Sequence, residues 1–261
     1  MGNPENSARR SPLRGAAFDR EPRLPRRVAR VAGLLALCAL AVPAHAAKVR
    51  GRVTQFELLE NPVWAEAREP TRHGYSFREP VPTVPAKYRK PFPHIPKELC
   101  LAAISTTAQK PPRPILIRVG GGRTTPVTIV VPPGTQLTFQ NTDPFSHRLY
   151  GVGIKTFPPN DTSKGSTRDW TVPAAGVFEI RDELAPSLRM WVVAEPNVAA
   201  IAYPSMKGEF ALGVDEPGEY QIQAFFAGKK VGKPMPVTVE ARDVVIKESI
   251  VVADKNKKKA E

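Results

Sequence analysis

The chain consists largely of short apolar runs that are separated by proline or glycine. In residues 135–140 (TQLTFQ), apolar and polar side chains alternate, as they do in a half-buried strand. The sequences Pro-Pro-Gly at 132–134 and Asn-Thr-Asp-Pro at 141–144 predict turns, because Asn and Asp side chains can bond nearby backbone groups. Amphipathic helical patterns are almost absent. The pattern therefore predicts an all-β protein.

The predicted strands divide the chain into a central part and two flanking parts. Residues 113–194 form the central part, and its many short strands suit a Greek-key sandwich. Residues 195–253 show a hairpin pattern around the turn at 215–218 and predict a second small β unit. The strands expected in these two parts are 115–119, 127–131, 136–140, 146–153, 170–172, 177–180, 190–193, 209–212, 219–226, 236–240 and 244–252.

Residues 47–112 hold N-terminal strands followed by a proline-rich segment. We expect strands at 48–56 and 63–67, and a short apolar strand or turn at 99–105 that contains Cys100. Proline removes a backbone donor and fixes φ, so the stretch between 69 and 96 is predicted to be extended and irregular. Its prolines are Pro70, Pro80, Pro82, Pro85, Pro91, Pro93 and Pro96.

Residues 1–46 have the pattern of a signal peptide. An arginine-rich stretch ends at Arg30, an apolar run follows at 31–42, and Ala44-His45-Ala46 fits the cleavage rule. The apolar run is too short for a membrane span, so no transmembrane span is expected after cleavage. These features predict export to the periplasm or the extracellular space, with a basic tail at 254–261.

Charge and cysteine content narrow the function classes. The formal net charge is +13 at pH 7, but the positive residues are spread along the chain. Nucleic-acid binding would need a basic stripe with exposed aromatic residues, and the sequence shows neither. Of the two cysteines, Cys38 lies in the apolar run of the signal, so no intramolecular disulfide is expected in the mature chain.

The stretch from 134 to 150 carries a spaced set of residues that resembles the cupredoxin family of blue-copper proteins. The resemblance implies a cupredoxin-like sandwich in which His147 is the first copper ligand. The matching residues are Gly134, Thr135, Leu137, Phe139, Asn141, Asp143, His147, Leu149 and Tyr150.

The remaining copper ligands that this resemblance implies are missing. A blue-copper site uses two imidazoles, a thiolate and usually a weak axial Met. Alignment on Pro186 and the closing strand at 190–193 places Asp182 at the Cys position, Ala185 at the His position and Leu188 at the Met position. Met190 is predicted to face the opposite side of its strand, and Cys100 to be a buried, inert thiol.

Two interpretations of the pair His147 and Asp182 follow from the sequence. They could form a weak, vestigial metal site for a divalent cation with water as further ligand. They could instead form an ion pair that holds two loops together in place of a metal, which is the interpretation we favour. No other cofactor is expected, and copper remains the alternative, bound through His147 with unconventional ligands.

A second resemblance concerns residues 208–224. The sequences GEFAL at 208–212 and PGEYQIQA at 217–224 resemble the carboxypeptidase-regulatory, transthyretin-like fold, and residues 48–67 resemble its first two strands. The cupredoxin-like part is then either inserted in, or packed on, one split β-sandwich. The joint pattern, over roughly 48–232, is similar to cupredoxin-like proteins grouped with methylamine-utilisation proteins.

No enzyme motif is present. Gly120-Gly121-Gly122 reads as a hairpin loop rather than a phosphate loop, because Pro126 and its neighbours cannot open a helix. Trp170 and Trp191 are predicted to be core residues. The sequence therefore predicts an exported non-catalytic envelope protein with a binding or structural role. Alternatives are a copper or electron-transfer protein and a carbohydrate- or cell-wall-binding module, and the partner would be an envelope protein or a polysaccharide.

Overall fold

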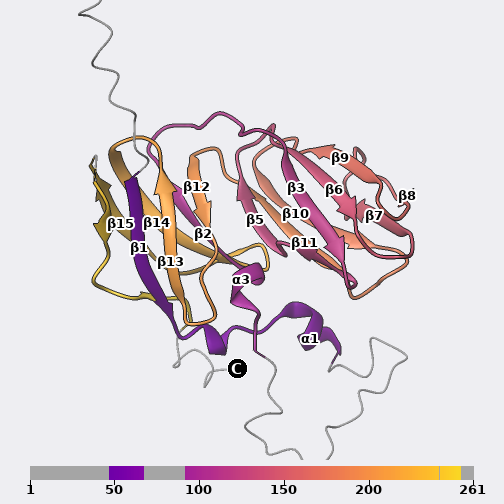
Figure 1. Ribbon diagram of the computed structural model, residues 1–261, viewed down its shortest axis with the longest axis horizontal. Helices are drawn as coiled ribbons and strands as arrows, with labels where there is room; N and C mark the ends of the chain where they lie inside the picture. Colours follow the sequence, from indigo (N-terminus) through magenta and orange to yellow (C-terminus); the bar gives the residue numbers. More distant parts are fainter. Residues whose placement is uncertain (1–46, 68–91, 241, 254–261) are drawn as a thin grey trace, which may run out of the picture. The chain divides into compact units, whose positions relative to one another are not determined.

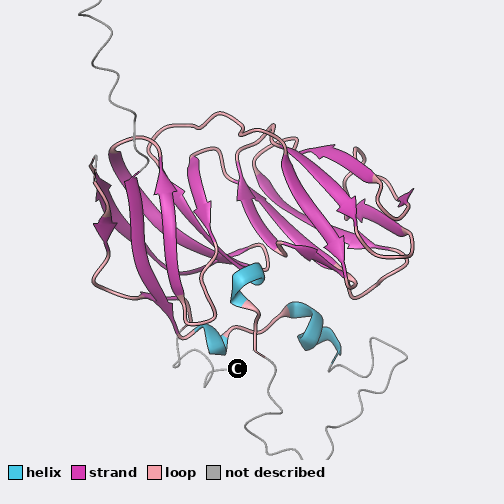
Figure 2. Cartoon of the chain, in the orientation of Figure 1, coloured by secondary structure: helices cyan, strands magenta, loops and turns pink. Residues whose placement is uncertain are grey.

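The computed structural model describes residues 47–67, 92–240 and 242–253. The predicted signal peptide at 1–46, the proline-rich stretch at 68–91 and the basic tail at 254–261 lie outside the described residues. The prediction of an all-β protein is confirmed, since strands make up nearly all the regular structure (Figure 2). No helix in the described part of the chain is long and apolar enough to cross a membrane.

The central strands form one two-sheet sandwich, which we call the inserted sandwich. One sheet has the strand order β4-β3-β6-β9 and the other β5-β11-β10-β7-β8 (Figure 1). The pairs β3–β6 and β5–β11 are parallel and the other pairs are antiparallel. The strands are β3 (Ile115–Gly120), β4 (Arg123–Thr125), β5 (Thr128–Val131), β6 (Gln136–Asn141), β7 (His147–Gly151), β8 (Asn160–Thr162), β9 (Thr167–Thr171), β10 (Gly176–Asp182) and β11 (Arg189–Ala194).

Alternation along the strands builds the core of the inserted sandwich. In β6, Leu137, Phe139 and Asn141 are buried, while the residues between them are half-buried, as the sequence pattern predicted. Phe139 packs against Phe157, with ring centroids 5.4 Å apart, and Phe157 packs against Trp170. Trp170 and Trp191 are 3% and 7% exposed, so the prediction that both are core residues is confirmed.

The flanking strands form a second sandwich, which we call the split sandwich because its strands come from both sides of the inserted one. β1 pairs with β13, and β2 lies between β12 and β14. The sheets are β13-β1-β16, with β17 also on β1, and β12-β2-β14-β15. The strands are β1 (Ala47–Thr54), β2 (Leu99–Ile104), β12 (Val198–Ala202), β13 (Glu209–Val214), β14 (Gly218–Phe226), β15 (Lys229–Val239), β16 (Val244–Val245) and β17 (Ile250–Val251).

Buried residues of the two sandwiches also contact one another. Cys100 and Ala102 of β2 and Phe225 of β14 share a cluster with Val130 of β5 and Val193 of β11. Strands β5 and β11 of the inserted sandwich therefore share this cluster with β2 and β14 of the split sandwich. The sequence left open whether the central part is inserted in one split sandwich or packed on it. In the strand pairing, strands from both sides of the central part form the split sandwich, so the central part is inserted in it.

The strand predicted at 63–67 was wrong, because this segment is the helix α1 (Pro62–Ala67). The Asn61 side chain accepts the N–H of Val63 at 3.0 Å, and its backbone carbonyl accepts the N–H groups of Trp64 and Ala65. Pro62 occupies the first helical position, where its missing N–H costs nothing. The asparagine cap and the proline that follows it therefore favour a helix here, although the short apolar run predicted a strand.

The predicted strand 48–56 ends early, at Thr54. Gln55 has a φ of 63°, in the left-handed region, which ends the extended conformation. A short 3-10 helix, η1 (Phe56–Leu58), follows, and a further helical turn, α3 (Ile95–Glu98), precedes β2.

Candidate functional site

His147 lies at the start of β7, at one end of the inserted sandwich. The turn between β6 and β7 supplies Asp143, and β10 supplies Asp182 as its last residue. Because β10 pairs with β7, with Asp182 opposite Leu149, the two strands bring Asp182 to the histidine. The structure thus places the two predicted site residues, His147 and Asp182, in direct contact.

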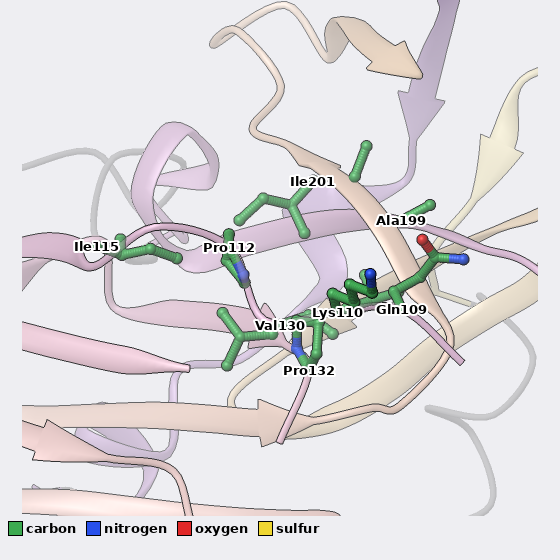
Figure 3. Close-up of a pocket in the computed structure, with 11 residues that line it drawn as sticks. Gln109, Lys110, Pro112, Ile115, Val130, Pro132, Ala199 and Ile201 are labelled. Carbon is green, nitrogen blue, oxygen red and sulfur yellow. The ribbon is translucent and has the colours of Figure 1, made fainter. Parts of the chain in front are cut away.

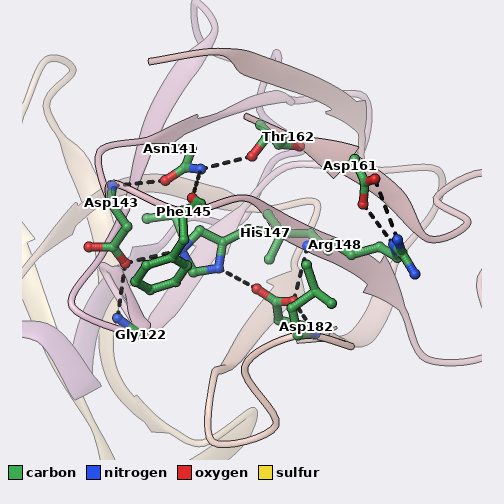
Figure 4. A network of polar contacts seen from close by, with 12 residues as sticks. Gly122, Asn141, Asp143, Phe145, His147, Arg148, Asp161, Thr162 and Asp182 are labelled. Atoms are coloured by element: carbon green, nitrogen blue, oxygen red, sulfur yellow. Dashed lines mark hydrogen bonds and ion pairs between the residues drawn. The ribbon is translucent and has the colours of Figure 1, made fainter. Parts of the chain in front are cut away.

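Both ring nitrogens of His147 are engaged by carboxylates (Figure 4). Nδ1 is hydrogen-bonded to Oδ2 of Asp182, and Nε2 lies 3.0 Å from Oδ2 of Asp143. The His147 side chain is 0% exposed, and the ring of Phe145 lies 5.0 Å away, centroid to centroid. We call Asp143, His147 and Asp182 the ionic clamp.

Both carboxylates of the clamp also accept backbone hydrogen bonds. Oδ1 of Asp182 accepts the N–H groups of Arg148 at 3.0 Å and Leu184 at 2.8 Å. Asp143 accepts the N–H groups of Gly121 at 2.7 Å and Gly122 at 3.2 Å. Each carboxylate therefore has two backbone N–H donors and one ring nitrogen of His147 around it.

The glycine turn and Asn141 fix the position of Asp143. Gly121 and Gly122 have φ values of 63° and 68°, which a two-residue hairpin turn requires, and the prediction of a hairpin loop here is confirmed. Oδ1 of Asn141 accepts the N–H of Asp143 at 2.8 Å, and its Nδ2 donates to the carbonyls of Phe145 and Thr162. This buried asparagine ties the turn to β8.

Sequence reasoning missed Asp143 as a site residue. It was used as a turn residue of the Asn-Thr-Asp-Pro sequence and as a match to the cupredoxin pattern, but not as a residue of the site. Its position four residues before His147 was the available signal, but that spacing brings the two together only because Asn141 closes the turn.

The backbone N–H groups that surround Asp143 lower its pKa below the ordinary value of 3.8. The Gly121 N–H is the largest cause, and the Gly122 N–H and His147 act in the same direction against the effect of burial. Because the folded-state pKa is depressed, this contribution to stability is present above pH 3.8 and is lost as the pH falls below that value.

We therefore expect the wild-type protein to lose stability faster than an Asp143→Asn variant as the pH falls from about 5 to about 2. The amide keeps an oxygen acceptor but does not titrate. Urea unfolding monitored by tryptophan fluorescence at a series of pH values measures the difference. Parallel curves for the two proteins would contradict the role given to Asp143.

The residues of the clamp do not fit a copper ion. The two ring nitrogens point in opposite directions, so Asp143 and Asp182 cannot join one nitrogen of His147 around a single ion. Ala185 and Leu188, at the other implied ligand positions, carry no donor atoms. Within the described residues no group of three or more His, Cys, Asp or Glu is placed to hold a metal.

Two sulfur-containing residues lie elsewhere. Met190 is 0% exposed and shares the core of the inserted sandwich with Leu188, so the prediction that it faces the opposite side was wrong. Residues two apart on a strand share a face. Cys100 is buried as predicted, and burial raises the pKa of its thiol to about 12, so it is not a ready nucleophile or ligand.

Comparison with known proteins finds distant similarity in structure alone. No family model and no curated protein matches the sequence. The chain is similar to a purple cupredoxin from Nitrosopumilus maritimus, with 19% identity and a TM-score of 0.29 over 31% of this chain and 99% of that one. An amicyanin from Paracoccus versutus has 14% identity and a TM-score of 0.30 over 36% and 91%.

A copper-containing nitrite reductase from Thermus scotoductus has 17% identity and a TM-score of 0.29 over 36% of this chain and 25% of its own length. The comparisons therefore give a distant cupredoxin-like similarity over about a third of this chain.

Proposed function

We propose that this protein is an exported, non-catalytic envelope protein whose ionic clamp takes the place of a metal centre, with a binding or structural role. One observation carries the proposal: both ring nitrogens of His147 face carboxylate oxygens. A ring that donates from both nitrogens is an imidazolium cation, and a cation has no lone pair to give to copper. The pattern of residues 1–46 supports export.

The clamp links three separate parts of the inserted sandwich. Asp143 belongs to the turn after β6 and is bonded to the β3–β4 turn, while Asp182 ends β10. One buried cation between two ionised carboxylates therefore holds loops that a shared metal would otherwise hold. The cation compensates one of the two negative charges, and the backbone N–H groups that donate to both carboxylates stabilise the other.

A catalytic role gains no support from the clamp. The His147 ring is fully buried, and the oxygens of the two carboxylates are hydrogen-bonded to backbone N–H groups and to the ring. General acid or base chemistry needs a group within hydrogen-bond reach of a substrate proton. The enclosed ring leaves no approach of that kind.

We expect no stoichiometric copper binding. The purified protein and a His147→Ala variant are loaded with Cu(II), desalted and measured for metal content and visible absorption. The proposal predicts substoichiometric copper and no intense visible band in either protein. Stoichiometric copper in the wild type that disappears in the variant would contradict it and restore the copper-protein alternative.

A further inference from the structure

A cavity of about 200 Å³ lies between β5 and β12 (Figure 3). Four consecutive residues at the start of β12, 198–201, line one side, and the end of β5, with Val130, Val131 and Pro132, lines another. Successive side chains of a strand point to opposite faces. A cavity that touches four in a row therefore runs along the edge of the strand rather than beneath one face.

Both strands stand at the end of their sheets. β12 pairs with β2, and β5 pairs with β11, and each is a terminal strand in its sheet order. A terminal strand leaves one row of backbone N–H and C=O groups without a sheet partner. The cavity lies where these two strand edges approach each other.

Hydrogen bonds close the gap at both ends. At the first residue of β5, the Tyr203 hydroxyl donates to the carbonyl of Thr128 at 2.8 Å. At the other end, the N–H of Gln109 donates to the carbonyl of Pro196, in the turn before β12, at 2.7 Å. These closures favour a small molecule as occupant over a polypeptide strand, which would have to pass through both ends.

The lining combines apolar side chains with one charge. Ile115, Val130 and Ile201 are among the apolar residues, and Lys110 is the one charged residue of the eleven. The amide of Gln109 is already bonded to Ser105 and Thr107. The Lys110 ammonium is therefore the group that selects the charge of a ligand.

The cavity is partly open to solvent, and its volume suits a small ligand. An apolar cavity of about 150 Å³ holds benzene, and pockets for drug-sized ligands begin at about 300 Å³. We propose that this cavity binds a short aliphatic carboxylate, with its chain between β5 and β12 and its carboxylate at Lys110. This site goes beyond the proposed function and shares no residue with the ionic clamp, so either can fail without the other.

Isothermal titration calorimetry of the full chain with octanoate, octanol and octylamine tests the proposal. We expect octanoate to bind most tightly and octylamine most weakly. Lys110→Gln should weaken octanoate binding by about threefold or more and leave octanol binding unchanged. Lys155→Gln, which removes an exposed lysine of the inserted sandwich, is the matched control and should change neither.

A second pair of variants tests the location. Ala199 lines the cavity and is exposed, so Ala199→Phe should fill space there without disturbing the core and abolish octanoate binding. Ala211→Phe, at an exposed position of β13, should bind octanoate as the wild type does. The proposal is overturned if octanoate does not bind, if octylamine binds as tightly, or if Ala199→Phe binds octanoate unchanged.

Discussion

Replacing Asp182 with alanine is expected to lower the free energy of unfolding by about 3–5 kcal/mol, because it removes the fully buried one of the two carboxylates that pair with the buried cation. The Asp182 carboxylate is 0% exposed and contacts Nδ1 of His147. The substitution also removes the acceptor of the Arg148 and Leu184 N–H groups. Urea or thermal unfolding of the wild type and variant measures the loss.

Asp161→Ala is the matched control for this prediction. Asp161 pairs with the Arg148 side chain at 2.7 Å, but the two side chains are 56% and 41% exposed. Solvent screens such a pair, so we expect a far smaller loss than in Asp182→Ala. Equal losses in the two variants would contradict the special role of the buried carboxylate.

The effect of Asp182→Asn is expected to change sign when His147 is removed. In the wild-type background, the amide cannot neutralise the imidazolium, so the substitution should cost about 1–3 kcal/mol. In a His147→Leu background, the Asp182 carboxylate is a buried anion without a cation. There the neutral amide should recover about 1–3 kcal/mol, since its oxygen still accepts from Arg148 and Leu184.

Chemical denaturation of the four proteins in this cycle measures the coupling between His147 and Asp182. The ionic clamp requires a coupling energy well above about 0.5 kcal/mol. Additive losses, with Asp182→Asn destabilising both backgrounds equally, would mean that the two side chains do not interact as charges.

Features encoded by neighbouring residues could be predicted from the sequence. The alternation in residues 135–140 specified a strand with Leu137 and Phe139 inside, and the Gly121-Gly122 pair specified a tight hairpin. The strand and the hairpin depend on backbone geometry within a few residues. The nearness of Asp182 to His147 was instead implied by the resemblance to cupredoxins, and the structure places the two side chains in contact.

Features that depend on contacts distant in sequence could not be predicted in the same way. The pairing of β1 with β13 and of β2 with β14 joins segments on both sides of the central strands, and the apolar pattern of each strand fits several partners. The role of Asp143 depends on N–H groups more than twenty residues away in the chain. The cavity beside β12 depends on which strands end their sheets.

The central claim is that His147 is a buried imidazolium held by Asp143 and Asp182. Nitrogen-15 NMR of selectively labelled histidine, assigned with a His147→Ala variant, reports the protonation of each ring nitrogen directly. At neutral pH the account predicts that Nδ1 and Nε2 of His147 both carry protons, and that one equivalent of Cu(II) leaves both signals unchanged. An unprotonated ring nitrogen, or loss of the His147 signals on adding copper, would contradict it.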